Sequence, residues 1–417
     1  MRIGIIGAGA AGLTASWLLQ ENHDITLFEK TARLGGHADT VKIDGDQSEV
    51  SVESGFEFFS DAMFPTFVQL LNVLGLELKR YPLTATIYTT DHRQNMLLPP
   101  FREGKIVWSG LRPASLSRLL QFQRTLGLAE RMASAPYTTL TVGQLFERLP
   151  VALAFKEEFL WPFFLAQWCV EPDDFNTFSA YNAVQYATRI RGGNFSPPLA
   201  ITITGGTQAY IQKLAQSSPR TALKISATIR SITRTNDGYF VEEADGCQSE
   251  FDHLIVATGA HDAQLLLAGL PEARERCKEL DSIEYFNTTI AVHSDSRWMP
   301  AQRHNWSVVN IRYDGTHASS TIWHPGRSER PVFRSWVTYD EALPSSLYAL
   351  TTYKHAKVNL QYYEAQKHLL SLQGRDHLWL AGLYMHDIDC HESAILSAVK
   401  IARQLAPDSS NLRKLRF

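Results

Sequence analysis

The N-terminal residues combine short, continuous apolar runs with one helical stretch. Residues Ile3 to Ile6 are all apolar and lead to Gly7, the residues from Ala11 to Gln20 follow a helical pattern, and Ile25 to Phe28 form a second apolar run that ends at Glu29. Short apolar runs bounded by glycine or charge are typical of buried strands in a parallel sheet. The order strand, glycine turn, helix, strand therefore predicts the opening of a doubly wound α/β fold.

The pattern changes twice further along the chain. From about residue 79 to 200 it becomes helical and rich in aromatic residues, and from about 282 to 350 it becomes strand-rich. Alternating strands and helices return between these segments, and the chain closes with a helix from about Glu392 to Leu405. We therefore expect one α/β nucleotide-binding domain assembled from separated segments and an inserted α+β substrate-binding domain. The first would comprise residues 1–78, 201–281 and 373–417, and the second residues 79–200 and 282–372.

Composition excludes several classes of protein. The chain has 417 residues, 44% of them hydrophobic and 20% charged, which is ordinary for a globular protein of more than one domain. The net charge of −3 and the scattered basic residues give no reason to expect nucleic acid. Since no apolar run approaches the roughly 18 residues of a spanning helix, we expect no transmembrane segment, while peripheral membrane contact stays open.

Cysteine usage points to a compartment. The four cysteines lie far apart, without a CxxC pair, and match neither a disulfide framework nor a zinc site. The N-terminus has no secretory signal pattern. A reducing environment, and hence the cytoplasm, is the expected location.

The turn after the first predicted strand has the pattern GxGxxG. Gly7 permits the tight turn, Gly9 lets a pyrophosphate approach the backbone, and Gly12 lets the helix pack closely on the strand. The helix that opens at Ala10 and Ala11 then offers free N–H groups and the positive end of its dipole to the phosphates. The position of the motif between a strand and a helix predicts a dinucleotide site.

The segment after the second predicted strand favours FAD over NAD. Glu29 ends this strand, where a carboxylate can accept both ribose hydroxyls. The glycine pair in Arg33-Leu34-Gly35-Gly36-His37 lets the chain cross close to a dinucleotide, and Arg33 can neutralise phosphate charge. We therefore predict a Rossmann-like FAD-binding domain. Its cofactor contacts in this segment would be Glu29, Lys30, Arg33, Gly35, Gly36 and His37.

These motifs resemble the flavin-containing amine oxidase superfamily, which shares an FAD fold with glutathione reductase. The resemblance extends to Gly205-Gly206-Thr207 at a helix start, to the run Leu254 to Gly259 and to Gly382 after an apolar strand. It implies that the last helix begins beside the pyrimidine end of the flavin, where its dipole favours the anionic reduced form. The further cofactor residues implied are Gly55, Phe56, Ile229, Thr258, Gly259, Gly382, Leu383, Glu392, Ser393 and Ala394.

Within the superfamily, the chain is most similar to bacterial FAD/NAD-binding proteins often encoded beside cyclopropane-fatty-acyl synthases. The similarity covers nearly the whole chain. It rests on Arg33 to His37, Gly55-Phe56, His293-Ser294-Asp295, Met299-Pro300, Trp306, Gln366 to Gly374 and His391-Glu392.

Three departures from the superfamily pattern bear on function. Glu53 stands where the pattern usually has Asp, Leu383 where an acidic residue often contacts the ribityl chain, and Thr288 where amine oxidases carry a lysine that holds water at flavin N5. Ordinary amine oxidation is therefore disfavoured. We expect an FAD-dependent oxidoreductase that removes a hydride from a C–H bond of a hydrophobic, lipid-like substrate. The alternatives are an amine oxidase acting on a secondary or aromatic amine, or a flavin-binding protein without turnover; the electron acceptor stays open.

Several other side chains have two interpretations. Trp161, Phe164 and Trp168 are expected, with Thr288, to line the substrate pocket, although core packing explains an aromatic cluster equally well. His293 is a candidate acid or base, and a structural strand histidine is an equal alternative. The sequence His386 to Glu392 has metal-ligand residue types but no second cluster, so we expect a polar loop and no metal. For Cys390, an inert thiol is favoured over covalent flavin attachment.

Overall fold

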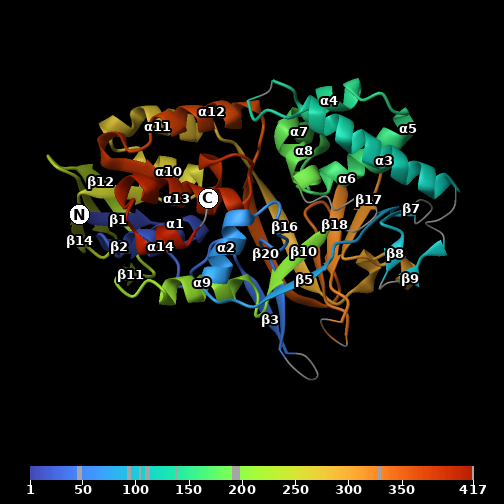
Figure 1. Ribbon diagram of the computed structural model, residues 1–417, viewed down its shortest axis with the longest axis horizontal. Coiled ribbons are helices and arrows are strands. Elements are labelled where there is room, and N and C mark those ends of the chain that lie inside the picture. The colour runs from blue at the N-terminus through green and yellow to red at the C-terminus, as the bar shows by residue number, and fades with distance from the viewer. Residues whose placement is uncertain are drawn as a thin grey trace.

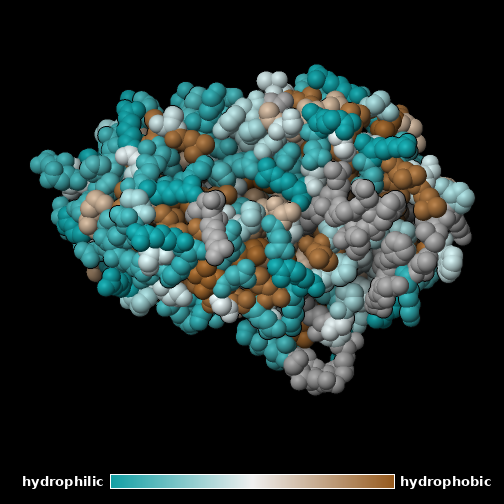
Figure 2. Space-filling model, viewed as in Figure 1, coloured by the Kyte–Doolittle hydropathy of each residue, from teal (hydrophilic) through white to brown (hydrophobic). Residues whose placement is uncertain are grey.

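A computed structural model describes most of the chain in two parts that lie side by side (Figure 1). The described residues are 1–44, 49–91, 95–102, 105–108, 113–137, 139–189, 198–326, 328 and 330–415. The part at the left of Figure 1 contains the N-terminus and a parallel sheet, and the part at the right contains a mostly antiparallel sheet with helices above it. Figure 2 shows that apolar residues on this face form separate groups among polar ones.

The first part is organised around a five-stranded parallel sheet in the order β11-β2-β1-β15-β21. The central strands β1 (Arg2–Ile6) and β15 (His253–Val256) are almost wholly buried, which explains their continuous apolar runs. Three further strands complete the sheet: β2 (Asp24–Phe28), β11 (Ala222–Lys224) and β21 (Leu378–Leu380).

Helices cover one face of this sheet and a small antiparallel sheet covers the other. Helix α1 (Ala10–Leu19) lies between the strands and α13 (His391–Leu405), with α9 (Thr207–Gln216) beside it. On the opposite face, the Phe251 ring packs against Gly4 so closely that a Cβ at Gly4 would lie 2.8 Å from the ring. Phe251 belongs to the meander β12 (Ile229–Arg234), β13 (Tyr239–Glu243) and β14 (Gln248–Phe251).

The second part is built on a seven-stranded sheet in the order β20-β16-β19-β18-β17-β6-β7. Strands β6 and β17 pair in parallel, so the two inserted segments, far apart in sequence, join in one sheet. Its strands are β6 (Ala85–Thr89), β7 (Asn95–Leu98), β16 (Tyr285–His293), β17 (Val309–Tyr313), β18 (Ala318–Trp323), β19 (Phe333–Trp336) and β20 (Leu347–Ala356).

Helices from the first inserted segment lie over the right-hand end of this sheet (Figure 1). Helix α6 (Trp161–Leu165) packs against β17 and β18. The other helices of this layer are α3 (Pro113–Met132), α4 (Val142–Arg148), α5 (Leu153–Phe155), α7 (Pro172–Thr177) and α8 (Ala180–Arg189).

Short elements connect the two parts. Strand β5 (Leu78–Pro82) pairs antiparallel with β10 (Leu199–Ile203), and β3 (Thr40–Ile43) pairs with β4 (Val50–Glu53). The turn of this last hairpin, residues 45–48, lies outside the described residues. The remaining helices are α2 (Pro65–Val73), α10 (Ala260–Leu267), α11 (Arg274–Asp281), α12 (Leu360–Ser371) and α14 (Ser410–Lys414).

The predicted fold class, a discontinuous Rossmann-like domain with an α+β insertion, is confirmed by this topology. The residue boundaries of the two domains remain a proposal. Helix α12, which we assigned to the substrate-binding part, packs against α11 of the parallel-sheet part.

Candidate flavin-binding and active site

Four strands of the parallel sheet end at the same edge, and the predicted cofactor motifs follow them directly. Gly7 follows β1, Glu29 follows β2, Thr258 and Gly259 follow β15, and Gly382 follows β21. Because the four strands pair in parallel, these residues, which span most of the chain, meet at one edge. Ligands of open α/β sheets bind outside the carboxyl ends of the strands.

The glycine turn forms a cradle that fits a pyrophosphate. Gly7 has a positive φ of 104°, and a Cβ at Gly12 would lie 1.9 Å from the Gly7 carbonyl oxygen, so both positions exclude a side chain. At Gly9, by contrast, a Cβ would meet no heavy atom within 4 Å. Since α1 begins here without a side-chain cap, the space over Gly9 faces the open N–H end of a helix, the environment that favours phosphate.

A second glycine pair, Gly35-Gly36, lies against the first glycine turn. Gly35 pairs with Gly9, its N–H donates to the Ala8 carbonyl over 2.9 Å, and it has a positive φ of 113°. Arg33 stabilises this crossing, because its guanidinium donates to the carbonyls of Gly36 at 2.8 Å and Ala38 at 3.1 Å. The predicted phosphate-neutralising role of Arg33 is therefore joined by a structural one.

Glu29, the predicted ribose contact, lies next to the cradle. One carboxylate oxygen accepts from the Ala8 N–H at 3.0 Å, and the other accepts from the Thr31 N–H and hydroxyl at 2.9 Å each. The chain leading to Ile229 runs beside it, since the Ala227 N–H donates to the Glu29 carbonyl. Lys30 is exposed and pairs with Asp262 at 3.0 Å.

His37 continues the cradle in the opposite direction. Burial lowers the pKa of His37. Its ring lies 5.1 Å from the Tyr353 ring and 5.6 Å from the His355 ring. Gly55 packs closely against the His37 carbonyl. A Cβ atom at Gly55 would lie 2.0 Å from that carbonyl oxygen. The Phe56 N–H donates to the same carbonyl at 2.9 Å, and the Phe56 ring stacks on His391 with centroids 4.3 Å apart. Direct contacts thus link the glycine cradle, His37 and Phe56 to the first turn of α13.

The beginning of α13 is held by side chains of the predicted cofactor segment. The Glu392 carboxylate accepts from the N–H groups of Thr66 and Phe67, so it caps α2. The Ser393 hydroxyl donates to the Ile388 carbonyl at 2.6 Å, and Ala394 is buried. Gly382 donates its N–H to Ser397 of α13, while the neighbouring Leu383 is exposed. Helix α13 itself starts without a side-chain cap, leaving its positive end available to a ligand.

Comparison with known sequences agrees with this geometry. The sequence profile described as flavin containing amine oxidoreductase matches residues 10–344. The chain belongs to this flavin-containing amine oxidoreductase family. Its cofactor is FAD. A putative flavin-containing monoamine oxidase, AofH of Mycobacterium tuberculosis, is 26% identical over 274 residues, which cover 61% of this chain and 56% of that relative. The chain thus matches little more than half of the relative's length.

Solved structures of other proteins share the fold over nearly the whole chain. Putrescine oxidase, in a triple mutant, superposes with a TM-score of 0.71 at 14% identity, covering 98% of this chain and 99% of that one. A fatty acid isomerase from P. acnes gives a TM-score of 0.68 at 14% identity, covering 97% and 98%. At such identities the likeness concerns the fold alone.

In this flavin oxidoreductase, an aromatic wall stands beside His37, and sequence reasoning missed most of it. Phe286 and His355 are directly paired across β16 and β20, and Thr288 is paired with Tyr353 on the same face. The His355 ring lies 5.6 Å from His37, 5.9 Å from Phe286 and 5.8 Å from Trp336. The only sequence signal for this set was the two-residue period of the strands, which cannot say which face meets the cofactor.

We define the aromatic wall as Phe286, Trp336, Tyr353 and His355. Two buried polar atoms in or beside this wall have no hydrogen-bond partner among the described residues. They are the Thr288 hydroxyl and the Nε2 atom of His355. Burial lowers the pKa of His355 to about 3, so its imidazole is neutral. The rings of the wall are uncharged, although the Arg334 guanidinium lies 5.2 Å from the Trp336 ring and the Tyr353 hydroxyl donates to the Asp39 carboxylate at 3.0 Å. The two unpartnered atoms are places where a polar atom of a ligand or water can bind.

The aromatic cluster predicted to line the substrate pocket is divided by the structure. Phe164 is 1% exposed, and its ring meets Phe146 edge-on at 5.6 Å, as expected for a core residue. Trp161 lines a separate surface groove of about 1200 Å³, next to α4 and the end of β17. Trp168 is joined to the aromatic wall through Phe178, with ring distances of 6.0 Å and then 6.2 Å to Phe286. Of the three, only Trp168 lies near the wall.

His293 is placed as a structural residue. It is fully buried, its Nε2 atom bonds to the Ser335 hydroxyl at 2.8 Å, and its Nδ1 atom accepts from the Asp295 N–H at 3.1 Å. With both ring nitrogens engaged, the structure favours the structural over the catalytic interpretation. Within the described part of the chain, no group of three or more His, Cys, Asp or Glu side chains is arranged for a metal, and no helix is both long and apolar enough to cross a bilayer.

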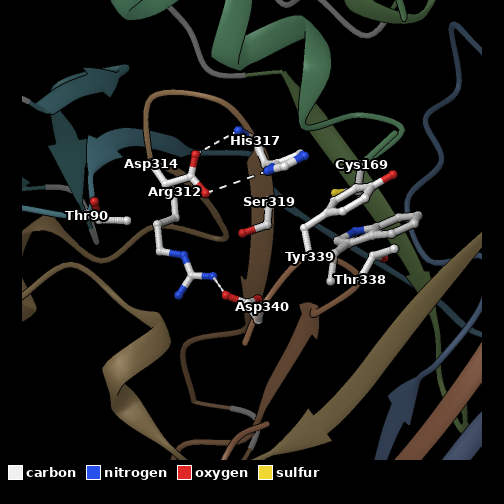
Figure 3. Close-up of a pocket in the computed structure, with 10 residues that line it drawn as sticks. Thr90, Cys169, Arg312, Asp314, His317, Ser319, Thr338, Tyr339 and Asp340 are labelled. Atoms are coloured by element: carbon white, nitrogen blue, oxygen red, sulfur yellow. Dashed lines mark hydrogen bonds and ion pairs between the residues drawn. The ribbon is translucent and has the colours of Figure 1, made fainter. Parts of the chain in front are cut away.

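Figure 3 shows a small polar cavity in the second part of the molecule. It has a volume of about 110 Å³ and shares Trp336 with the aromatic wall. Arg312 pairs with Asp340 across it, and the His317 ring stacks on Tyr339 at 4.2 Å. Its polar groups are largely paired with one another, so we assign it no ligand.

Proposed function

We propose that this flavin oxidoreductase removes a hydride from a C–H bond of a hydrophobic, lipid-like substrate that lies between the flavin and the aromatic wall. The observation that carries the proposal is the composition of that wall. Phe286 and Trp336 flank a neutral His355, and none of the three offers a negative charge to an ammonium group. A mainly aromatic surface suits an apolar substrate and limits the access of water to hydride transfer.

Bound FAD supplies the electron-accepting chemistry. The residues of this chain would hold and orient it: Gly9 and the N-terminus of α1 at the pyrophosphate, Glu29 at the ribose, and the N-terminus of α13 at the far end. Thr288 stands where amine oxidases carry a lysine, and this difference supports chemistry other than ordinary amine oxidation.

The test is anaerobic mixing of the holoprotein with hydrophobic alcohols, acyl compounds and amines. Bleaching of the flavin band by a lipid-like compound, with a product two hydrogens lighter, supports the proposal. Bleaching by amines alone supports the second candidate, oxidation of a secondary or aromatic amine, which the similarity to AofH favours. Failure of every compound would support a flavin-binding protein without turnover.

The four free thiols also support our proposal of a reducing, cytoplasmic location.

A further inference from the structure

The surface groove beside Trp161 is a second place where the molecule can bind a ligand. It has a volume of about 1200 Å³, and its lining comes from α4, α5, the π-helical turn η2 (Lys156–Leu160), the start of α6 and the ends of β6 and β17. Figure 1 shows α4, α5 and α6 together at the upper right, above β17. Sites for small molecules usually enclose roughly 300–1,000 Å³. A surface groove larger than this suits a segment of a macromolecule.

Part of the lining is apolar and held in place. The Trp161 ring is half-buried and meets Phe146 edge-on at 5.2 Å and Phe175 at 5.4 Å, so its orientation is fixed before any ligand binds. Leu153, which also lines the groove, is 67% exposed. A fixed aromatic ring next to an exposed aliphatic side chain is the composition of an anchor point in a protein interface, because little side-chain freedom is lost on binding.

The π-helical turn places charge next to this ring. Pro162 has no N–H, so it cannot donate the α-helical bond to the Glu158 carbonyl. The turn before it is wider than an α-helical turn, since the Trp161 N–H donates to the Lys156 carbonyl, five residues earlier. The side chains of Lys156, Glu157, Glu158 and Trp161 all line the groove as a result. Such turns are rare and frequently occur at functional sites.

Carboxylates predominate among the charged side chains of the groove. Lys156 is the single cation in the described lining, and its ammonium donates to the carbonyls of Phe146 at 2.5 Å and Glu147 at 3.4 Å. The excess of negative charge in the groove is greater than that of the whole chain, whose net charge is −3. The five carboxylates in the lining are Asp91, Glu147, Glu157, Glu158 and Asp314.

These carboxylates come from different elements and act on the same space. Burial raises the pKa of Tyr313 at the end of β17, and the negative charges of Asp314 and Glu157 raise it further, so η2 and the end of β17 share one electrostatic environment. Asp314 accepts from N–H groups of its own turn. Within the part of the chain that the structure describes, Glu147, Glu157 and Glu158 form no ion pair. A cationic ligand would relieve their mutual repulsion.

We propose that the groove binds a basic peptide segment of a partner protein, with Lys or Arg side chains at the carboxylates and an apolar side chain against Trp161. A small polyvalent cation would leave Trp161 and Leu153 in water, and a purely apolar ligand would take water from the carboxylates without replacing their hydrogen bonds. A basic segment with an apolar residue meets both requirements. None of the predicted cofactor residues lines the groove, so the inference does not depend on the proposed function.

The experiment measures binding of the peptide KKLRWKK, labelled with fluorescein, to the holoprotein by fluorescence anisotropy. We expect a dissociation constant of about 10 µM or lower in about 50 mM NaCl. It should rise about tenfold or more in about 500 mM NaCl, because salt screens the carboxylates. The peptide KKGRGKK, which keeps the charge without the apolar side chains, should bind about fivefold more weakly or worse.

Two variants and a matched control locate the binding site. Glu157→Gln/Glu158→Gln should weaken binding of KKLRWKK about tenfold or more, and Trp161→Ala about fivefold or more. The control Glu341→Gln/Glu364→Gln removes two exposed carboxylates outside the groove and should change the constant less than about twofold. Melting temperature and FAD content establish that each variant is folded. If Trp161→Ala does not fold, the comparison of the two peptides on wild type tests the same contact.

Several outcomes would overturn the inference. They are failure of KKLRWKK to bind, equal weakening by the control variant, equal binding of KKGRGKK, and displacement of KKLRWKK by an equal concentration of spermine, which would assign the groove to small cations. Self-association of the wild-type chain that Glu157→Gln/Glu158→Gln abolishes would assign the groove to a second copy. Carbodiimide cross-linking of bound KKLRWKK should join it to Glu147, Glu157 or Glu158, and links confined to other carboxylates would also overturn the inference. Flavin reduction has no part in these measurements, so their failure leaves the proposed function untouched.

Discussion

The Glu392 carboxylate accepts a hydrogen bond from the Thr66 N–H over 2.8 Å, so a residue at the start of α13 caps the start of α2. Its second oxygen accepts from the Phe67 N–H over the same distance. Phe64, the residue at the N-cap of α2, contributes no side-chain cap, and Pro65 has no N–H. The C-terminal helix is thereby fixed to an element more than three hundred residues earlier in the chain.

Substituting Glu392 by Ala should destabilise the protein, because two buried N–H groups of α2 lose their acceptor. We expect a decrease of about 1–2 kcal/mol in the free energy of unfolding, measured by urea denaturation of the holoprotein. Glu364 on exposed α12 surface provides the control, and Glu364→Ala should change stability by less than about 0.5 kcal/mol. Equal effects of the two substitutions would contradict the capping role.

Substitutions at Gly9 and Gly12 should impair the protein for different reasons. Gly9 has a φ of −78° and open space at its Cβ position, so Gly9→Val should fold normally and lose FAD affinity more than tenfold, because the side chain occupies the phosphate site. In Gly12→Ala the new Cβ would collide with the Gly7 carbonyl, and we expect destabilisation of about 1–3 kcal/mol. FAD titration and urea denaturation of each apoprotein separate the two. Normal FAD binding by Gly9→Val would show that the phosphate does not bind at Gly9.

Glu29→Gln should weaken FAD binding by about 1.5–3 kcal/mol, because a neutral amide cannot make charge-assisted bonds to the ribose. The measurement is the FAD dissociation constant, from fluorescence titration of the apoprotein. Glu21→Gln is a matched control, since that carboxylate accepts from Ser410 in another part of the surface and should leave the constant unchanged. An unchanged constant in Glu29→Gln would show that the ribose is bound elsewhere.

Primary amines should reduce the flavin slowly or not at all. Thr288 stands on the face of the aromatic wall, where its buried hydroxyl cannot act as a lysine does. Benzylamine and a polyamine should leave the absorbance of the oxidised flavin unchanged for minutes under anaerobic conditions, while dithionite bleaches it at once. Rapid bleaching by benzylamine would favour the amine oxidase alternative.

Replacing Phe164 by Ala and replacing Trp168 by Ala should have different effects on stability and on flavin reduction. Phe164→Ala should cost about 3–5 kcal/mol of stability and leave substrate preference unchanged, because the ring lies in the core. Trp168 contacts Tyr186 at 5.5 Å and reaches the wall through Phe178, so Trp168→Ala should also change the rate of flavin reduction by a true substrate. Unfolding curves and stopped-flow reduction test both variants. If Trp168→Ala alters stability alone, it is a core residue like Phe164.

The strand, glycine turn and helix of the proposed cofactor site could be predicted from sequence largely because their determinants are local. Gly7, Gly9 and Gly12 are required within one turn, and Glu29 ends the next strand, so spacing along the chain is also spacing in the structure. The same holds for the apolar runs of β1 and β15, whose burial on both faces leaves a continuous hydrophobic signature.

Only the tertiary structure decided what faces the proposed cofactor site. The aromatic wall depends on the antiparallel register of β16 and β20, which places Phe286 opposite His355, and a shift of one residue would turn both rings to the other face. The sequence by itself determined the α/β fold and the phosphate cradle, since these follow from local backbone geometry. The substrate side arises from contacts between residues hundreds of positions apart, and a linear pattern does not record such contacts.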